Sequence, residues 1–164
     1  MNCKWVEYQS DEYQEMLNLR YEVLRKPLGL NYTAEQLSAE ATDYFLGGYE
    51  DDKLVACLKI TPLSKHQFQL KQMAVHPIYQ GLGHGAQLVT FAESNLKMKG
   101  ANKIILHARQ SAIGFYQKVG YVCFGDEYFE VGIRHRSMQK YLKELVFQLQ
   151  LCLQLSHAKF VSCL

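Results

Sequence analysis

The sequence has no long run of charges of one sign. Its 164 residues include 18 lysines and arginines against 16 aspartates and glutamates, which gives a formal net charge of +2. No stretch carries five or more like charges in succession. Nucleic-acid-binding domains usually show a clustered basic face and an isoelectric point above about 9. The nearly balanced charge therefore argues against nucleic acid as a partner.

Long apolar runs and paired cysteines are also lacking. No segment reaches the ~18 consecutive apolar residues of a membrane span, and the opening "MNCKWVEYQS" lacks the apolar stretch of a signal peptide. The cysteines form no C-x-x-C pair, and no histidine pair has metal-ligand spacing; they are Cys3, Cys57, Cys123, Cys152 and Cys163. We therefore expect a single-domain cytoplasmic protein with reduced thiols, no metal and no membrane partner.

Hydrophobic periodicity predicts a mixed α/β (α+β) chain. Helices are expected over residues 11–26, 33–40, 111–119 and from the glycine-rich segment to residue 99. Ser10 or Asp11 is expected to cap the first helix, Thr33 the second, and Pro27 to end the first. Gly100 and Gly120 are expected to terminate the later helices. Strands are expected over residues 4–9, 44–50, 53–61, 66–75, 103–108, 121–129 and 132–139.

The connections between these strands predict the sheet. The early strands are joined by short turns, which favours an antiparallel meander. The unit spanning residues 68–108 places a helix between two strands, and its right-handed crossover makes those strands parallel. The result is a mostly antiparallel sheet of six to seven strands with one parallel pair, flanked by about four helices.

We expect one domain that spans residues 1–140 and a C-terminal extension beyond it. In residues 141–164, Leu142, Leu145 and Leu149 fit helical spacing, whereas the alternation from Phe147 to Leu155 fits a strand. We favour an additional helix that packs on the domain or on a second subunit. The extension therefore makes a homodimer one of the expected assemblies.

The segment "QGLGHG" at residues 80–85 is the main candidate for ligand binding. A Walker loop needs a lysine and a hydroxyl that this segment lacks. A dinucleotide fingerprint matches G-x-G-x-x-A, but "HPIY" separates it from its strand and no carboxylate follows "ILHAR". The third chemistry, a pyrophosphate held by backbone N–H groups at a helix N-terminus, needs neither metal nor lysine. An ordinary capping turn remains the alternative, although it explains one glycine better than three.

Two longer segments resemble the GNAT superfamily of N-acetyltransferases. "MAVHPIYQGLGHGAQLVTFAE" is similar to its motif A and "HARQSAIGFYQKVGY" to its motif B. The ending "YFEVGIRHRSMQK" resembles that of a group of small bacterial GNAT proteins. The resemblance implies a GNAT fold, acetyl-CoA as acyl donor, and a primary amine of a small molecule or peptide as acceptor.

The resemblance also implies which residues bind acetyl-CoA. The strand containing Met73, Ala74 and Val75 pairs its backbone with the pantetheine arm, next to a gap where it separates from residues 103–108. The pyrophosphate is wrapped by the main chain of the loop, with additional contacts from motif B. These loop and motif B residues are Gln80, Gly81, Leu82, Gly83, His84, Gly85, Ala112 and Phe115.

For catalysis, the resemblance assigns Tyr116 as the acid that protonates the departing thiolate. A phenol of pKa about 10 can donate to a thiolate whose acid has a pKa of about 8.5. The alternative is a core aromatic on the apolar stripe of its helix. Glu130 and His135 are the first choices to accept the proton of the amine, although a histidine between two arginines is often a surface residue.

The acceptor is only weakly specified. Arg20, Arg25 and Lys26 could attract an anionic acceptor, but we favour a solvated helix face. His107 is expected to be a structural histidine in a buried strand. The competing function to an N-acetyltransferase is a non-catalytic regulatory module of GNAT fold that binds acyl-CoA. A dinucleotide-dependent oxidoreductase would need the carboxylate that is missing after "ILHAR".

Overall fold

The computed structural model describes residues 1–142, and all statements below concern this part of the chain. Its sheet has seven strands in the order β1-β2-β3-β4-β5-β7-β6. The strands are β1 (Asn2–Val6), β2 (Tyr44–Glu50), β3 (Lys53–Pro62), β4 (Gln67–Val75), β5 (Lys103–Arg109), β6 (Val122–Glu130) and β7 (Ile133–Tyr141). The α-helices are α1 (Asp11–Arg20), α2 (Ala34–Ser38), α3 (His84–Met98) and α4 (Ile113–Lys118).

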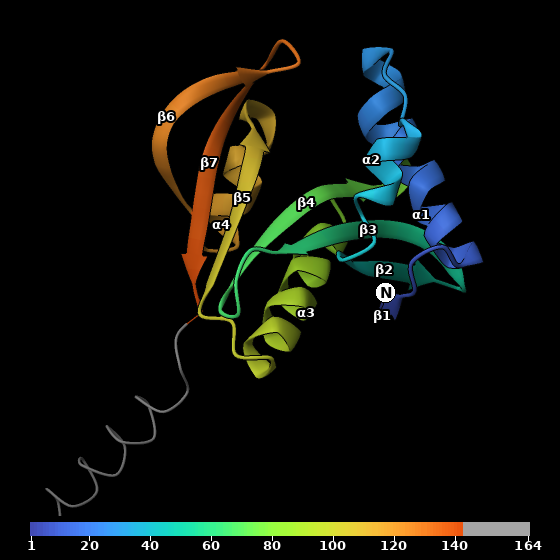
Figure 1. The fold of residues 1–164 in the computed structure, drawn as a ribbon, viewed down its shortest axis with the longest axis horizontal. Coiled ribbons are helices and arrows are strands. Elements are labelled where there is room, and N and C mark those ends of the chain that lie inside the picture. Colours follow the sequence, from blue (N-terminus) through green and yellow to red (C-terminus); the bar gives the residue numbers. More distant parts are fainter. Residues whose placement is uncertain (143–164) are drawn as a thin grey trace, which may run out of the picture.

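The sheet separates two apolar layers (Figure 1). Helices α1 and α2 lie on one face and α3 lies on the other. Side chains of a strand alternate between faces, so Phe45 packs with α1 whereas Leu46 packs with α3. In the same way Cys57 belongs to the α1 layer and Leu58 to the α3 layer. Because both faces are covered, β2 and β3 read as nearly continuous apolar runs.

The helix boundaries confirm the predicted caps but correct two of the predicted helices. Ser10 Oγ accepts a hydrogen bond from Tyr13 N at 3.2 Å, and Thr33 forms a capping box with Gln36. The first helix does not end at Pro27. It passes from α1 into a π-helical turn (Tyr21–Arg25) and a 3₁₀ turn (Lys26–Leu28) that ends at Gly29, whose φ is 65°. Proline is accepted there because the first residues of a helical turn need no N–H partner.

The helix predicted over residues 111–119 is likewise shorter than expected. It consists of a 3₁₀ turn (Gln110–Ala112) followed by α4. The predicted terminators are confirmed by their backbone conformation, since Gly100 and Gly120 have φ of 88° and 93°. These left-handed values favour glycine because they disfavour a Cβ atom.

The parallel pair β4–β5 is confirmed, and it is short. Paired residues run from Gln67 with Lys103 to Leu70 with Leu106. Beyond Leu70, β4 continues against β3 only, and β5 continues against β7 only. Figure 1 shows the two strands diverging from this point. The divergence leaves one edge of β4 without a neighbouring strand.

A β-bulge in β4 begins where the strands separate. Cys57 pairs with Ala74 and Lys59 pairs with Lys71, so Leu58 on β3 faces two residues of β4. One of these, Gln72, has a φ of 49°, a left-handed value that few residues other than glycine adopt. A bulge of this kind bends its strand and increases its twist. It therefore explains why β4 turns away from β5.

The predicted fold class is confirmed by this mixed sheet. The end of β7 connects to Leu142, which is buried and donates its N–H to Asn102 O at 2.8 Å. The rest of the predicted extension over residues 141–164, and the homodimer that depends on it, lie outside the described residues. Across residues 1–142, none of the helices is both long and apolar enough to cross a membrane.

Candidate active site

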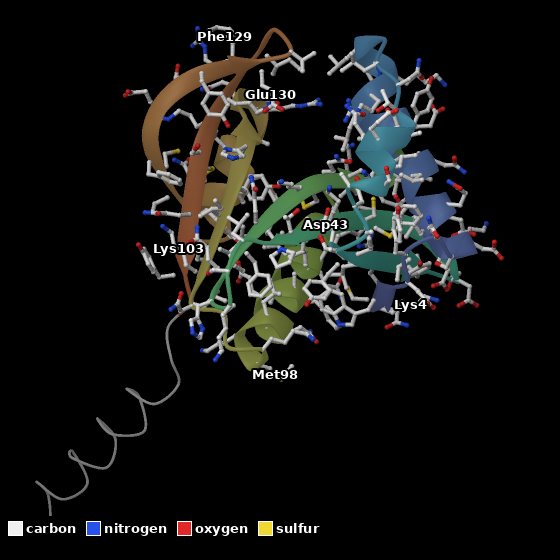
Figure 2. All side chains as sticks on the ribbon, in the orientation of Figure 1. Lys4, Asp43, Met98, Lys103, Phe129 and Glu130 are labelled. Carbon is white, nitrogen blue, oxygen red and sulfur yellow. The ribbon has the colours of Figure 1, made fainter. Side chains whose placement is uncertain are left out.

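A cavity of about 440 Å³ lies where β4 and β5 diverge. Its walls come from β4, β5, α4 with the 3₁₀ turn before it, the β6–β7 hairpin, and the segment that connects α1 to α2. Figure 2 shows the β6–β7 hairpin and the α1–α2 region facing each other above the sheet, with Glu130 on the hairpin. Among the predicted site residues, the cavity brings together Met73, Ala112, Tyr116, Glu130 and His135.

The free edge of β4 provides backbone hydrogen-bonding groups. Ala74 is buried in the α1 layer, so its side chain points away from the α3 side. Met73 and Val75 pack instead against the α3 layer. An unpaired strand edge presents N–H and C=O groups that can bind an extended ligand as an additional strand. This edge therefore suits an amide-containing arm such as pantetheine.

The glycine-rich loop ends in an uncapped helix N-terminus. Gly81 and Gly83 have φ of 78° and 87°, and a Cβ built at either position would meet no atom within 4 Å. Gly83 is the N-cap of α3, and no side chain caps the helix. The first N–H groups of a helix have no intrahelical partner and carry its positive dipole end. The loop therefore offers open space and unpaired donors to an anion.

The side chains of this loop differ in how far they contact the rest of the protein. Gln80 folds back and donates from Nε2 to Val75 O at 2.9 Å, which ties the loop to the end of β4. Leu82 is 66% exposed. His84 is only 13% exposed and its Nδ1 lies 3.8 Å from Glu50 Oε1. The His84 side chain is therefore largely shielded from solvent and points toward Glu50.

A continuous set of contacts links the loop to the cavity. A Cβ placed on Gly85 would lie 3.3 Å from Phe115 Cζ and 3.7 Å from Met73 Cε. Met73 Sδ in turn lies 4.0 Å from the hydroxyl oxygen of Tyr116. The absence of a side chain at Gly85 lets α4 approach the first turn of α3. The glycine-rich loop and the cavity are therefore parts of one continuous region.

Tyr116 is both a core residue and a cavity residue. Its side chain is 8% exposed and its ring packs edge-on against Phe115 and Tyr121. Burial raises the pKa of Tyr116 above the ordinary phenol value. The hydroxyl consequently keeps its proton at neutral pH, as a proton donor must. The two interpretations of Tyr116 are thus compatible.

Glu130 and His135 face the cavity from the β6–β7 hairpin. His135 is buried, which corrects the picture of a surface residue between two arginines. Its Nδ1 lies 2.8 Å from Ile133 O. Because a carbonyl only accepts, Nδ1 carries the proton in this contact and Nε2 is left as an acceptor in the neutral ring. Glu130 is exposed, at the hairpin turn.

His107 is hydrogen-bonded, as expected of a structural histidine, but its side chain is exposed although its strand is part of the core. It lines the cavity, where its Nδ1 lies 3.1 Å from Ser137 Oγ. Desolvation by the surrounding protein lowers the pKa of His107, although the nearby charge of Glu130 acts in the opposite direction. His107 is therefore a neutral polar group of the site at physiological pH.

Arg20 was expected on a solvated helix face, but the structure places it in the protein interior. It is fully buried and forms hydrogen bonds of 3.1 and 2.6 Å to the two carboxylate oxygens of Glu40. Arg20 also donates to the side-chain oxygen of Gln72, which accepts a second hydrogen bond from Tyr32 at 3.0 Å. The bulge of β4 is thereby attached to α1 and to a residue of the cavity wall. Sequence reasoning missed this network.

Three further cavity residues were not predicted as site residues. Lys71, Gln72 and Arg109 line the cavity beside Tyr32. Arg109 donates to Leu24 O at 3.2 Å and so bridges β5 and the π-helical turn. The sequence does contain a signal for Arg109. Because side chains alternate along a strand, Arg109 lies on the same face of β5 as His107, and the core residues lie on the opposite face.

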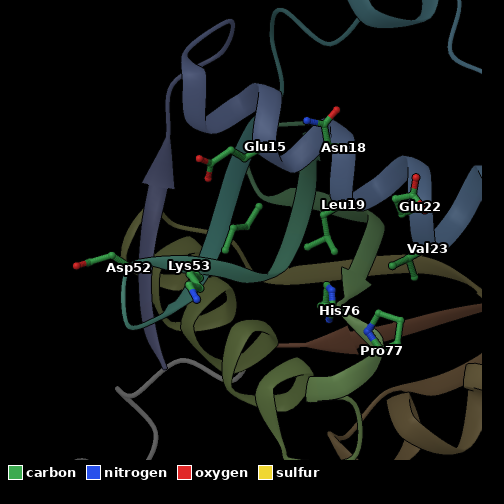
Figure 3. Close-up of a pocket in the computed structure, with 10 residues that line it drawn as sticks. Glu15, Asn18, Leu19, Glu22, Val23, Asp52, Lys53, His76 and Pro77 are labelled. Carbon is green, nitrogen blue, oxygen red and sulfur yellow. The ribbon is translucent and has the colours of Figure 1, made fainter.

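A second cavity, of about 570 Å³, lies beside α1 and the end of β4 (Figure 3). It is lined by Glu15, Asn18, Leu19, Glu22, Val23, Asp52, Lys53, Leu54, His76 and Pro77. None of the predicted site residues is among them. Within residues 1–142 no group of three or more histidine, cysteine, aspartate or glutamate side chains is arranged to hold a metal ion.

A mixed sheet whose parallel pair separates over a cavity, beside a glycine-rich helix N-terminus, is the architecture of a GNAT-fold acetyltransferase. Residues 11–142 match the family model described as the acetyltransferase (GNAT) domain. The chain therefore belongs to the GNAT family of acetyltransferases.

Individual relatives are similar to this chain over part of its length. An uncharacterised protein of Bacillus subtilis, YyaT, is 36% identical over 75 residues, which is 46% of this chain and 51% of that protein. An uncharacterised ycf52-like N-acetyltransferase of Prochlorococcus marinus is 33% identical over 69 residues, 42% of this chain and 38% of that protein. The matched segments thus span about half or less of these relatives.

Solved structures show the same fold. A putative N-acetyltransferase of Lactobacillus plantarum superposes with a TM-score of 0.77 at 23% identity and covers 87% of this chain and 100% of its own. An aminoglycoside 6'-N-acetyltransferase complexed with coenzyme A has a TM-score of 0.70 at 16% identity, over 88% of this chain and 98% of its own. At these identities the likeness concerns the fold alone.

Proposed function

We propose that the protein is an acetyl-CoA-dependent N-acetyltransferase that acetylates a primary amine of a small molecule or peptide. The observation that carries this proposal is the free edge of β4 beyond Leu70, which opens into a cavity with Tyr116 among its lining residues. The uncapped N-terminus of α3 would hold the pyrophosphate, and the free edge would pair with the pantetheine arm.

In the proposed reaction the neutral amine attacks the thioester carbonyl directly. A nitrogen–carbon bond forms and the carbon–sulfur bond breaks, so the acetyl group passes to the amine. Tyr116 gives its proton to the departing thiolate. The proton released by the amine passes to Glu130 or to Nε2 of His135, both of which face the cavity. The carbonyl oxygen is stabilised by a backbone N–H on the edge of β4 near Val75.

Binding is tested by calorimetric titration with acetyl-CoA, with NADH as the control ligand. Gly83→Asp places a side chain and a negative charge in the anion site, and we expect it to abolish binding. Gly125→Asp is the matched control, because Gly125 also has a left-handed φ (66°) and open space around a Cβ, but lies on the edge strand β6. Equal affinity for acetyl-CoA in wild type and Gly83→Asp would refute the loop assignment.

Catalysis is tested by Tyr116→Phe, measured as release of the free thiol of CoA. Loss of a general acid costs about 10²–10⁴-fold in rate, so kcat is expected to fall at least 100-fold while acetyl-CoA still binds. Tyr121→Phe is the control, since this neighbouring tyrosine is also buried but does not line the cavity. Unchanged kcat in Tyr116→Phe would remove the acid role. A wild type that binds acetyl-CoA without turnover would instead indicate the regulatory module.

A further inference from the structure

More positively than negatively charged side chains line the cavity. Three side chains are cationic, namely Arg25, Lys71 and Arg109, and one is anionic, Glu130. Within residues 1–142 none of the three cations forms an ion pair, although other lysines and arginines do. Uncompensated positive charge at a concave surface attracts and retains anions. The cavity is therefore suited to a negatively charged group that residues 1–142 do not supply.

Lys71 shows the contrast most directly. It pairs with Lys59 across β3 and β4, so both side chains lie on the same face of the sheet. Lys59 is neutralised by two carboxylates, with Nζ 3.2 Å from Glu40 Oε1 and 2.7 Å from Asp43 Oδ2. Among the described residues Lys71 has no such partner, and it lines the cavity instead.

The two arginines keep donors available for a ligand. Arg25 stacks on Tyr32, with its guanidinium carbon 4.6 Å from the ring centroid. Arg109 uses one nitrogen to reach Leu24 O. A guanidinium has five N–H donors, so each arginine retains most of its capacity for a carboxylate or phosphate. These contacts fix the position of both side chains without neutralising them.

The pyrophosphate of acetyl-CoA does not account for these cations. In the proposed function it lies on the backbone of residues 80–85, and no residue of that loop lines this cavity. The cations surround the space left for the acceptor, beside Tyr116 and Glu130. Their field also disfavours a protonated amine, so it favours the neutral form that attacks the thioester.

We propose that the acceptor is a small amine that also carries an acidic group, a carboxylate or a phosphate, which binds Arg25, Lys71 and Arg109. This inference rests on the proposed function and specifies the substrate class. The amine would lie toward Glu130 and the thioester, and the acid toward the three cations. A cavity of about 440 Å³ suits a molecule of amino-acid size.

The test compares amines that differ only in the acid group. Phenylalanine is paired with phenethylamine and leucine with isopentylamine for the carboxylate, and phosphoethanolamine with ethanolamine for the phosphate. Acetylation is followed by thiol release at saturating acetyl-CoA, and binding by calorimetry in the presence of CoA. We expect kcat/KM to be at least tenfold higher for the acid-bearing member of one pair, which also identifies the acid.

Variants locate the effect at the cations. Arg25→Gln and Lys71→Gln are expected to raise KM for the acid-bearing amine about tenfold or more, because each removes a charge-assisted hydrogen bond. With the acid-free partner kcat/KM should fall much less than with the acid-bearing amine, and the affinity for acetyl-CoA should be unchanged. Lys26→Gln is the matched control, since Lys26 adjoins Arg25 but is 58% exposed and pairs with Glu22.

The outcomes separate this inference from the proposed function. If acetyl-CoA fails to bind wild type, the proposed function itself is refuted. If acetyl-CoA binds but the amines without an acid group are preferred, or no acid-bearing amine binds or reacts, only the acceptor class is refuted. If Arg25→Gln or Lys71→Gln lowers kcat/KM equally for both members of a pair, the acceptor class is also refuted. Weaker acetyl-CoA binding in Arg25→Gln or Lys71→Gln would assign the cations to the acyl donor.

Discussion

Replacing Arg20 by methionine tests how the buried polar network stabilises the fold. Arg20 is fully buried and Glu40 is 2% exposed, so neither charge is solvated. In wild type the carboxylate of Glu40 also contacts Lys59 at 3.2 Å and accepts from Tyr13 at 2.8 Å. Without Arg20, the carboxylates of Glu40 and Asp43 share the single ammonium of Lys59. The variant therefore leaves one negative charge buried and uncompensated.

The expected cost follows from this imbalance. Removing one partner of a buried ion pair destabilises a protein by about 3–5 kcal/mol. Stability is measured by urea unfolding, where a slope of about 1–3 kcal/mol per molar converts that loss into a midpoint lower by roughly 2 M. Lys4→Met is the control, because it breaks an ion pair with Glu12 whose side chains are 46% and 41% exposed. Exposed pairs contribute less than about 1 kcal/mol.

A double variant and a pH series sharpen the test. Adding Glu40→Gln to Arg20→Met removes the uncompensated charge, so the double variant should be more stable than Arg20→Met alone.

The pH dependence of stability gives a second test. Burial raises the pKa of Glu40, but hydrogen bonds and charge from Arg20 outweigh this and lower it. The stability due to ionised Glu40 is thus complete above its ordinary pKa of about 4.3 and is lost as pH falls through the lower folded value. The difference in free energy of unfolding between wild type and Arg20→Met should therefore become smaller as the pH falls through this range. A midpoint shift no larger than that of Lys4→Met would refute the reasoning.

Two further predictions concern the hairpin turn and the core thiol. Val131 and Gly132 form the two-residue turn between β6 and β7 with φ of 52° and 72°; Asn-Gly is favoured in such turns and a β-branched residue is not. Val131→Asn should therefore stabilise the protein by about 1 kcal/mol and raise the calorimetric midpoint by about 2–4 °C, and a lower midpoint would contradict this. Burial raises the pKa of Cys57 to about 12, so iodoacetamide at pH 8 should spare it while modifying the half-buried Cys123, as peptide mass spectrometry would show. Rapid labelling of native Cys57 would contradict its burial.

Local patterns were sufficient to predict the helices and strands and to single out the glycine-rich loop. Alternation of apolar residues identified the strands, and the crossover rule made β4 and β5 parallel. The glycines of residues 80–85 signalled an exposed backbone because their requirement is local, a left-handed φ at Gly81 and Gly83. The roles assigned to Tyr116, Glu130 and His135 came from resemblance, and they stay predictions.

The bulge was missed although the sequence contains its signal. In β4 the residues that pack on the α3 layer change from even to odd numbers, from Phe68 and Leu70 to Met73 and Val75. An uninterrupted strand keeps one parity on each face, so this change requires one additional residue between them. Reading residues 66–75 as a single alternating strand concealed it. The divergence of β4 from β5 follows from this one residue.

Arg20 shows a different limit of sequence reasoning. Tyr13, Met16, Leu17 and Arg20 follow helical spacing, so the pattern places Arg20 on the buried stripe of α1. A buried arginine needs a carboxylate partner, but nothing local identifies Glu40, 20 residues later in the chain. The charge alone favoured a solvated position. Its true position depends on how α1 and the segment after α2 meet over the sheet.

The same network links the two halves of the candidate site. Gln72 adopts its left-handed backbone in the bulge while its side-chain oxygen accepts from Arg20 and Tyr32. A strained residue keeps such a conformation only when its surroundings hold it there. The gap at the edge of β4 is therefore maintained by residues of α1 and of the cavity wall. Acyl donor and acceptor would thus meet at a place that neither motif A nor motif B forms alone.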